Sequence, residues 1–196
     1  LQNIITNHSF ATGTPPNIGL APYNNTELDS NKRWNYQTVN ATGSFNNGQG
    51  YSARLASPGE ISFTGTANTT DISVPITAIT QNAYNLVGNP YSSFINSATF
   101  LTNNSSKLTS QTIWLWNEAT ESYEAKVTAS NYIIAPSQGF FIHSKKYTSN
   151  GADIPGESFN NTANVETDTI SFLKTNQSNI KIYLKIKKQS IYFKVK

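Results

Sequence analysis

The sequence contains no cysteine and no methionine. Without thiols the chain cannot form disulfide bonds, perform thiol catalysis or build a cysteine-based zinc site. Burial of apolar side chains must therefore hold the fold together. A chain of 196 residues buries roughly 70% of the surface that its unfolded form would expose, so a core without covalent crosslinks is feasible.

Charged residues are scarce as well. They make up 13% of the chain, against about 25% in an average soluble domain, and Asn, Thr and Ser fill the intervals between apolar runs. This composition is typical of an extracellular β protein, because β-branched residues fit a half-buried pleated surface. A cytosolic β protein with an Asn-rich composition is the alternative.

The small positive charge of the chain lies mostly near one end. The net charge is +3, and lysines are concentrated between residues 181 and 196. They alternate with Ile182, Leu184 and Ile186, which predicts the solvent-facing side of a strand rather than a surface for nucleic acid. No apolar run is long enough to cross a bilayer. We therefore expect neither a nucleic-acid partner nor membrane insertion.

Short alternating runs bounded by Gly, Pro and Asn recur along the whole chain and predict strands. The predicted strands are Arg33–Val39, Gly50–Leu55, Glu60–Thr64, Asp71–Ile76, Tyr84–Val87, Thr112–Trp116, Ser122–Val127, Gly139–His143, Thr169–Leu173, Ile180–Ile186 and Ile191–Val195. One short helix is predicted at Ser97–Thr102, with an equivalent at the N-terminus.

Two halves of the sequence align with each other at a shift of about ninety positions. Ile4–Ser9 matches Phe100–Ser105, and Tyr23-Asn24 matches Trp116-Asn117. Further matches are Trp34 with Tyr123, Gly48–Tyr51 with Ser137–Phe140, and Thr66–Val74 with Thr162–Phe172. Repeated supersecondary units of this kind bury a shared core.

We therefore predict an all-β fold, an antiparallel β-sandwich built from two diverged repeat units. The first unit spans residues 1–78, the second spans 79–172, and a basic β-hairpin follows at 173–196. Tyr84–Tyr91 has no counterpart in the first unit. Because the chain also begins without Met or a signal peptide, we expect a longer precursor that supplies the missing strand upstream, or a neighbouring chain that donates it.

Several motifs give the sequence a family resemblance. They are Gly19–Asn24, Asn47–Ala53, Ile61–Thr66, Asn85–Tyr91, Ile113–Asn117 and Ile134–Phe141. Together they resemble a β-rich repeated module of large secreted proteins of flavobacteria and other Bacteroidetes, exported by the type IX secretion system. The resemblance implies an extracellular or cell-surface location and implies no reaction. It also implies O-glycosylation at Asp168-Thr169-Ile170, for which an ordinary strand entry is the alternative.

Residues suited to catalysis or metal binding are few. His8 and His143 occupy unmatched positions of the two halves, and no nucleophile motif accompanies them. Glu118, Glu121 and Glu124 flank a predicted hairpin, where acidic residues are normally solvated. No loop around Asp29, Asp71 or Asp153 has the spacing of a calcium loop. We expect no enzyme activity, no metal and no cofactor.

Aromatic residues offer the better functional hypothesis. Trp114 and Trp116 share one face of a predicted strand, and Ile113 and Leu115 share the other. If the tryptophan face packs against a second sheet, it is core. If it stays exposed, it forms a flat platform for sugar rings. The candidate platform residues are Trp34, Tyr36, Trp114, Trp116 and Tyr132.

Three functions remain open at this stage. The first is a non-catalytic structural or adhesive module of a secreted cell-surface protein, which contacts polysaccharide or neighbouring surface proteins. The second is a carbohydrate-binding module attached to a polysaccharide-degrading enzyme. The third is a subunit of an extracellular filament that self-assembles by strand pairing.

Overall fold

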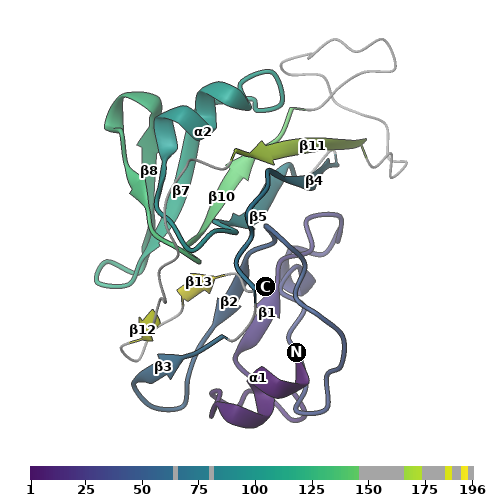
Figure 1. Cartoon of the computed structure of the whole chain (residues 1–196). Helices are drawn as coiled ribbons and strands as arrows, with labels where there is room; N and C mark the ends of the chain where they lie inside the picture. The colour runs from purple at the N-terminus through teal and green to yellow at the C-terminus, as the bar shows by residue number, and fades with distance from the viewer. Residues whose placement is uncertain (64–65, 80–81, 146–165, 174–183, 187–190, 194–196) are drawn as a thin grey trace.

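The computed structural model describes residues 1–63, 66–79, 82–145, 166–173, 184–186 and 191–193. The described strands pair in antiparallel fashion, so the fold is all-β (Figure 1). The helices are α1 (Gln2–Asn7) and α2 (Ser97–Asn103), with 3₁₀ turns η1 (Ser30–Lys32) and η2 (Thr128–Ser130). The strands are β1 (Leu20–Pro22), β2 (Tyr51–Ala53), β3 (Gly59–Ile61), β4 (Ile72–Ala78), β5 (Tyr84–Gly88), β6 (Ile95–Asn96), β7 (Thr112–Asn117), β8 (Ser122–Val127), β9 (Ile133–Ile134), β10 (Gly139–His143), β11 (Glu166–Phe172), β12 (Leu184–Ile186) and β13 (Ile191–Phe193).

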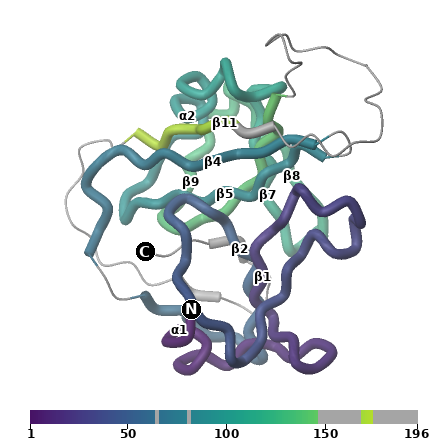
Figure 2. Tube along the Cα trace, turned by 90° about the vertical axis from the view of Figure 1, so that its right-hand side faces the viewer, coloured from purple at the N-terminus to yellow at the C-terminus, as the bar shows by residue number. Residues whose placement is uncertain are grey.

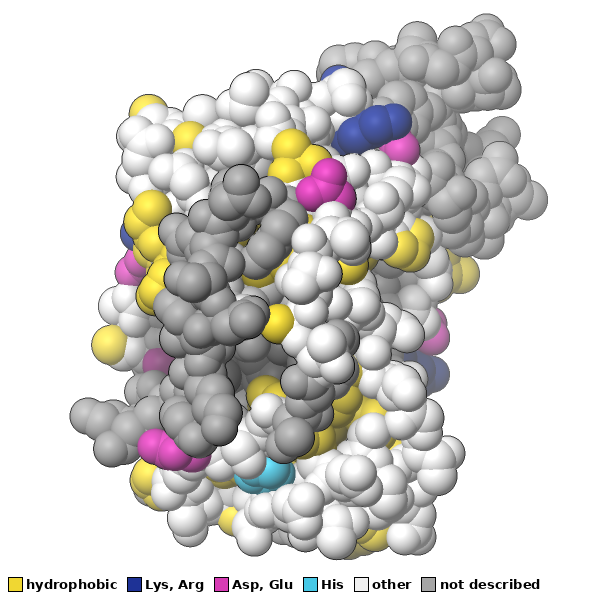
Figure 3. Space-filling model, in the orientation of Figure 1, with side chains coloured by type: hydrophobic (Ala, Val, Ile, Leu, Met, Phe, Trp, Pro, Cys, Tyr) yellow, Lys and Arg dark blue, Asp and Glu magenta, His cyan; other side chains and the backbone are white. Residues whose placement is uncertain are grey.

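Two hydrophobic cores divide the molecule into two lobes. We call β4 to β11 the large lobe, and residues 1–63 together with β12 and β13 the small lobe. Figure 2 shows them one above the other, with α2 and β11 at the top and α1 at the bottom. On the face seen in Figure 3, charged side chains are few among uncharged polar and apolar ones.

The large lobe is built around a four-stranded sheet in the order β5-β10-β7-β8. Side chains alternate along these strands, so one face of β10 presents Phe140 and Ile142 to the core, and both are fully buried. The two-stranded sheet β11-β4 covers the core from the other side with Ile170 and Val74. Helix α2 adds Phe100, which stacks against Phe172 of β11 at a centroid distance of 4.9 Å.

The small lobe has shorter strands. Its sheet has the order β1-β2-β13, and the pair β12-β3 forms a second small sheet. Tyr51 and Ala53 of β2 point inward, and Ile61 of β3 meets them in the small core. Ser52, between them in sequence, is partly exposed, as the period of two requires.

Many sequence predictions of local structure are confirmed. β8 and β10 have the predicted bounds, and α2 and α1 form where short helices were expected. The strand predicted at Arg33–Val39 is absent. There the chain makes isolated bridges, Tyr23 with Trp34 and Asn17 with Thr38, and separate backbone hydrogen bonds to β1, such as Gln37 N to Leu20 O at 2.8 Å, without forming a continuous strand.

Of the two strands predicted as a C-terminal hairpin, residues 184–186 and 191–193 are described and are strands, whereas 180–183 and 194–195 lie outside the described residues. β12 pairs with β3 and β13 pairs with β2, rather than with each other. β4 also has a different setting from the one expected: Val74 and Ile76 belong to the core of the large lobe, although the sequence placed them in the first unit. Of the residues considered for calcium, Asp153 lies outside the described part.

The lobes meet where two glycines allow close backbone contact. Gly50 N donates to Leu86 O at 3.1 Å, and Gly88 N donates to Gly48 O at 2.8 Å, so this segment extends the sheet beyond β5. A Cβ on Gly50 would lie 2.6 Å from Leu86 Cγ. Gly48 has φ +78°, and a Cβ there would lie 2.1 Å from Val74 Cγ2. Only glycine fits this junction.

Candidate ligand-binding site

The outer face of the four-stranded sheet is rich in aromatic side chains. The register places Trp114 of β7 beside Phe141 of β10, and Trp116 beside Tyr123 of β8. At the other edge Tyr84 of β5 makes an edge-to-face contact with Trp114 at 5.3 Å. The predicted division of β7 is confirmed, because Ile113 and Leu115 lie in the core while both tryptophans lie on the outer face.

The small lobe packs onto this face through one aromatic pair. Tyr23 and Trp34 are bridged to each other and contact edge-to-face at 5.1 Å. Both reach Phe141, Tyr23 at 4.9 Å and Trp34 at 6.1 Å between ring centroids. Phe141 is thereby only 6% exposed. Part of the aromatic face is therefore an interface between the lobes.

The remaining part of the aromatic face is open and forms a cavity. Its volume is about 360 Å³, within the range of roughly 300–1,000 Å³ usual for small-molecule sites. The walls are aromatic: Tyr84 is 40% exposed and Tyr123 is 42% exposed. The cavity is lined by Tyr23, Ser30, Arg33, Trp34, Tyr84, Trp114, Tyr123 and Phe141.

The loop between Tyr23 and Trp34 places the polar side chains of the cavity. Asn24 N donates to Arg33 O at 2.7 Å and closes the loop. Asp29 caps the turn η1 by accepting from Asn31 N, and this hydrogen bond lowers the pKa of Asp29. Arg33 Nε donates to Glu27 O at 3.1 Å, so the guanidinium is anchored on one side. The loop thus holds Arg33, the one charged residue among the described lining residues of the cavity.

Buried amides hold the aromatic walls in place. Asn82 Nδ2 donates to Tyr23 Oη at 3.1 Å, across the junction of the lobes. Asn25 Nδ2 donates to Thr77 O at 2.6 Å, and Thr77 N donates to Asn85 Oδ1 at 2.9 Å. Because these amide groups form their hydrogen bonds within the protein, they rigidify the site and are not the groups that we expect to bind a ligand.

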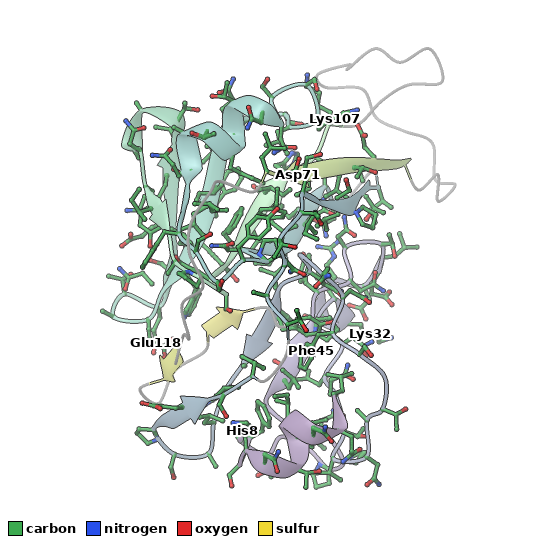
Figure 4. The ribbon with its side chains drawn as sticks, in the orientation of Figure 1. His8, Lys32, Phe45, Asp71, Lys107 and Glu118 are labelled. Carbon is green, nitrogen blue, oxygen red and sulfur yellow. The ribbon has the colours of Figure 1, made fainter. Side chains whose placement is uncertain are left out.

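The neighbouring hairpin between β7 and β8 contains the acidic residues noted in the sequence. Trp116 Nε1 donates to Glu118 Oε2 at 2.7 Å, which fixes the indole. Hydrogen bonds from Asn117 and Lys126 lower the pKa of Glu124. Figure 4 shows Glu118 at the edge of the molecule. These carboxylates therefore position side chains of the hairpin and do not line the cavity.

The structure brings together only some of the predicted platform residues. Trp34 and Trp114 line the cavity, and Trp116 lies on the same face, against Tyr123 at 5.1 Å. Tyr36 is 51% exposed and lines a different cavity of about 340 Å³ beside Arg54. Tyr132 packs against the large core and accepts a hydrogen bond from Gln138.

Four aromatic lining residues were not predicted as site residues. They are Tyr23, Tyr84, Tyr123 and Phe141. The internal alignment could have indicated Tyr23 and Tyr123, because it matched Tyr23 with Trp116 and Tyr123 with Trp34, and both tryptophans were predicted site residues. The contribution of Tyr84 required the pairing of β5 with β10, which no local pattern specifies.

A third cavity of about 420 Å³ lies between the lobes and is lined mainly by amides and aliphatic groups. Asn25, Thr77 and Asn85 in its wall already bond one another. Asn46 Nδ2 donates to Gln49 Oε1 at 2.9 Å in the same wall. The aromatic cavity therefore offers more surface that a ligand could use.

Neither histidine lines the aromatic cavity. Ser62 N donates to His8 Nε2 at 3.1 Å, which leaves the proton on Nδ1, and Nδ1 donates to Ile4 O at 2.9 Å. His8 is thus a structural residue at the end of α1 (Figure 4). His143 lies on β10 against Tyr84, with ring centroids 4.6 Å apart. Within the described ranges, no cluster of three or more His, Asp or Glu could hold a metal ion.

Helices in the described part are short. None of them combines the length and the apolar character needed to cross a membrane. The comparison with curated proteins gave no match, and neither did the comparison with solved structures.

One protein family matches the sequence over residues 5–129. The match covers most of the small lobe and the large lobe as far as β8, so it includes Tyr23, Trp34, Tyr84, Trp114 and Tyr123 of the cavity. It extends over more than half of the chain. The protein therefore belongs to the family described as a domain of unknown function, DUF8693.

Proposed function

We propose that this protein is a non-catalytic adhesive module of a secreted bacterial cell-surface protein, and that it binds glycans in the aromatic cavity. The observation behind the proposal is the set of exposed rings that two lobes bring to one open cavity. Exposed aromatic surface costs free energy in water and commonly marks a binding site. The low charge of the chain and its family resemblance support the extracellular location.

The chemistry of the cavity suits sugar rings. Trp34 and Trp114 offer flat apolar faces on which the C–H face of a pyranose can rest. Ser30 offers a hydroxyl, and Arg33 offers N–H donors and a fixed positive charge. A guanidinium pairs well with a carboxylate, so we expect glycans that contain uronic acids to bind more tightly than neutral ones.

We also infer that the two lobes are diverged copies of one β-sandwich unit. Asn104 Nδ2 donates to Phe100 O, and Ser171 N donates to Asn104 Oδ1 at 2.8 Å. His8 makes the same two kinds of bond, to Ile4 and from Ser62. The sequence alignment matches His8 with Asn104, so matched positions link α2 to β11 and the end of α1 to Ser62, the residue directly after β3.

Two further correspondences support the repeat. The Tyr23–Trp34 bridge matches the Trp116–Tyr123 register pair, and both ring pairs contact edge-to-face at 5.1 Å and 68°. Gly48 and the aligned Ser137 both have left-handed backbones, with φ of +78° and +58°. Turn geometry and cross-strand pairing therefore recur together in the two lobes.

The glycan proposal is tested by binding of the whole chain to an array of bacterial and plant polysaccharides, both neutral and uronic. Trp34→Ala and Trp114→Ala should each weaken binding of a positive glycan about tenfold or more, which corresponds to about 1.4 kcal/mol. Tyr36→Ala is the matched control, because Tyr36 is an exposed aromatic residue outside the cavity, and it should bind normally. Binding that survives both tryptophan substitutions, or an array without any positive glycan, would reject the proposal.

The second candidate, a binding module of a polysaccharide-degrading enzyme, uses the same cavity. It differs in what the precursor contains next to these residues. A catalytic domain in the same polypeptide would favour it over the adhesive module.

A further inference from the structure

The edges of β2 and β3 in the small lobe are covered by strands from the far end of the chain. β13 pairs with β2 in the register Ile191–Ala53, Tyr192–Ser52 and Phe193–Tyr51. β12 pairs with β3, with Lys185 opposite Glu60. Uncovered, these edges would present unpaired backbone N–H and C=O groups.

The large lobe has strands at the same two places, but it takes them from the chain that directly precedes its helix. β5 pairs with β10, with Leu86 opposite Phe141. The internal alignment matches Phe141 with Ser52, so Tyr192 of β13 stands where Leu86 of β5 stands. β13 is therefore the positional equivalent of β5.

The second strand follows the same rule. The hydrogen bonds to the equivalent residues His8 and Asn104 match Ser62 with Ser171, so β3 corresponds to β11. This assignment replaces the sequence match of Thr66–Val74 with Thr162–Phe172, because β4 and β11 pair with each other within the large lobe. β11 pairs with β4, with Ile170 opposite Val74. β3 pairs with β12, with Ile61 opposite Leu184. β12 is therefore the positional equivalent of β4.

The sequence agrees with this assignment at four of the six positions and differs at Lys185 against Pro75 and at Ile191 against Asn85. Leu184-Lys185-Ile186 corresponds to Val74-Pro75-Ile76, with branched apolar residues at both ends. Tyr192-Phe193 corresponds to Leu86-Val87, two apolar residues in succession. In the large lobe these strands enter the core with Val74, Ile76 and Val87.

We propose that β12 and β13 are the displaced first two strands of the small lobe, and that the chain completes this lobe with its own C-terminal segment. The inference rests on the two-unit organisation proposed above, and it is independent of glycan binding. In the large lobe β4 and β5 precede the helix α2, whereas β12 and β13 follow the rest of the small lobe in the sequence. The acceptor edges of β2 and β3 are filled within one chain, which leaves no vacancy there for a neighbouring subunit's strand.

Engineered cysteines test the pairing in the full-length chain, because the natural sequence contains no thiol. Glu60→Cys combined with Lys185→Cys places thiols at directly opposed positions, where Cβ atoms are about 4.5–5.5 Å apart. Mild oxidation should give a disulfide within one chain, seen by non-reducing electrophoresis and intact mass. Glu60→Cys with Ile186→Cys is the control, because adjacent strand residues point to opposite faces, and it should crosslink at least tenfold more slowly.

A second pair, Ser52→Cys with Tyr192→Cys, tests β13 against β2 in the same way. A disulfide between chains at either site would overturn the proposal and favour strand donation in a filament. Equal crosslinking of the test and control variants would also overturn it. Hydrogen exchange tests the same pairing in the unsubstituted chain. Strong protection of the amides of residues 51–53 is expected. Free exchange of those amides in β2 that point toward β13 would contradict the pairing.

Discussion

The two lobes differ most in how the chain supplies their strands. The large lobe takes β4 to β11 from one continuous stretch of sequence, whereas the small lobe combines residues 1–63 with β12 and β13. Its strands are also shorter, since β2 has three residues, whereas β10, with which the sequence alignment matches it, has five. Because contacts between distant parts of a chain form late and at an entropic cost, we expect the large lobe to be the more stable folding unit.

The largest effect should come from the matched core positions Phe140 and Tyr51. Phe140→Ala should reduce the free energy of unfolding by about 3–5 kcal/mol, because the ring is fully buried and leaves a cavity. Tyr51→Ala should cost less, about 2–3 kcal/mol, because Tyr51 lies in the smaller core. Urea unfolding followed by circular dichroism measures both. An equal or larger loss at Tyr51 would contradict the ranking of the lobes.

A smaller effect is expected at the residues that join each helix to its covering strand. Asn104→Ala should cost about 2 kcal/mol, because Asn104 is 2% exposed and its removal leaves Ser171 N–H without this acceptor. His8→Ala should cost about 1 kcal/mol, because His8 is partly exposed. His8→Asn copies the large lobe and should recover part of that loss. If His8→Asn is as unstable as His8→Ala, the two positions are not equivalent.

A further effect is confined to alkaline pH. Burial raises the pKa of Tyr91 in the large lobe to about 12 and also raises the pKa of Tyr51 in the small lobe. A tyrosine with a raised pKa in the folded state stabilises the protein fully below the unfolded-state pKa of about 10. This stabilisation is lost as pH rises toward about 12, by at most about 1.4 kcal/mol per pH unit for each group.

Phenylalanine substitutions separate these two contributions. Tyr91→Phe should flatten most of the decline in stability between pH 10 and 12, and Tyr51→Phe should flatten less of it. Urea midpoints at several pH values provide the measurement. A decline that is unchanged in Tyr91→Phe would assign alkaline sensitivity to other groups.

Alternation of side chains made the main strands predictable. In β10 the sequence separates Phe140 and Ile142 from Phe141 and His143, and the structure has the same division. The predicted strand at Arg33–Val39 failed because alternation alone does not provide a partner of matching length. Local sequence patterns could not predict the partners of β12 and β13 either, since strand pairing over a long sequence separation depends on the completed fold.

The candidate site was predictable where aromatic residues lie on regular strands. Trp114 was placed correctly on the outer face because β7 alternates between core and surface. Tyr36 and Tyr132 were grouped with it on composition alone, and they lie elsewhere because loop geometry decides their direction. The loop that delivers Arg33 and Ser30 has no periodicity from which its shape could be derived.

The turn before β2 has a consequence for how the lobes stay together. Ser137 adopts the same left-handed conformation as Gly48, so the turn itself tolerates a side chain. What position 48 does not tolerate is bulk toward Val74, which belongs to the other lobe. The absence of a Cβ at position 48 therefore lets the two lobes pack together. Gly48→Ser is expected to force the lobes apart while the turn keeps its conformation.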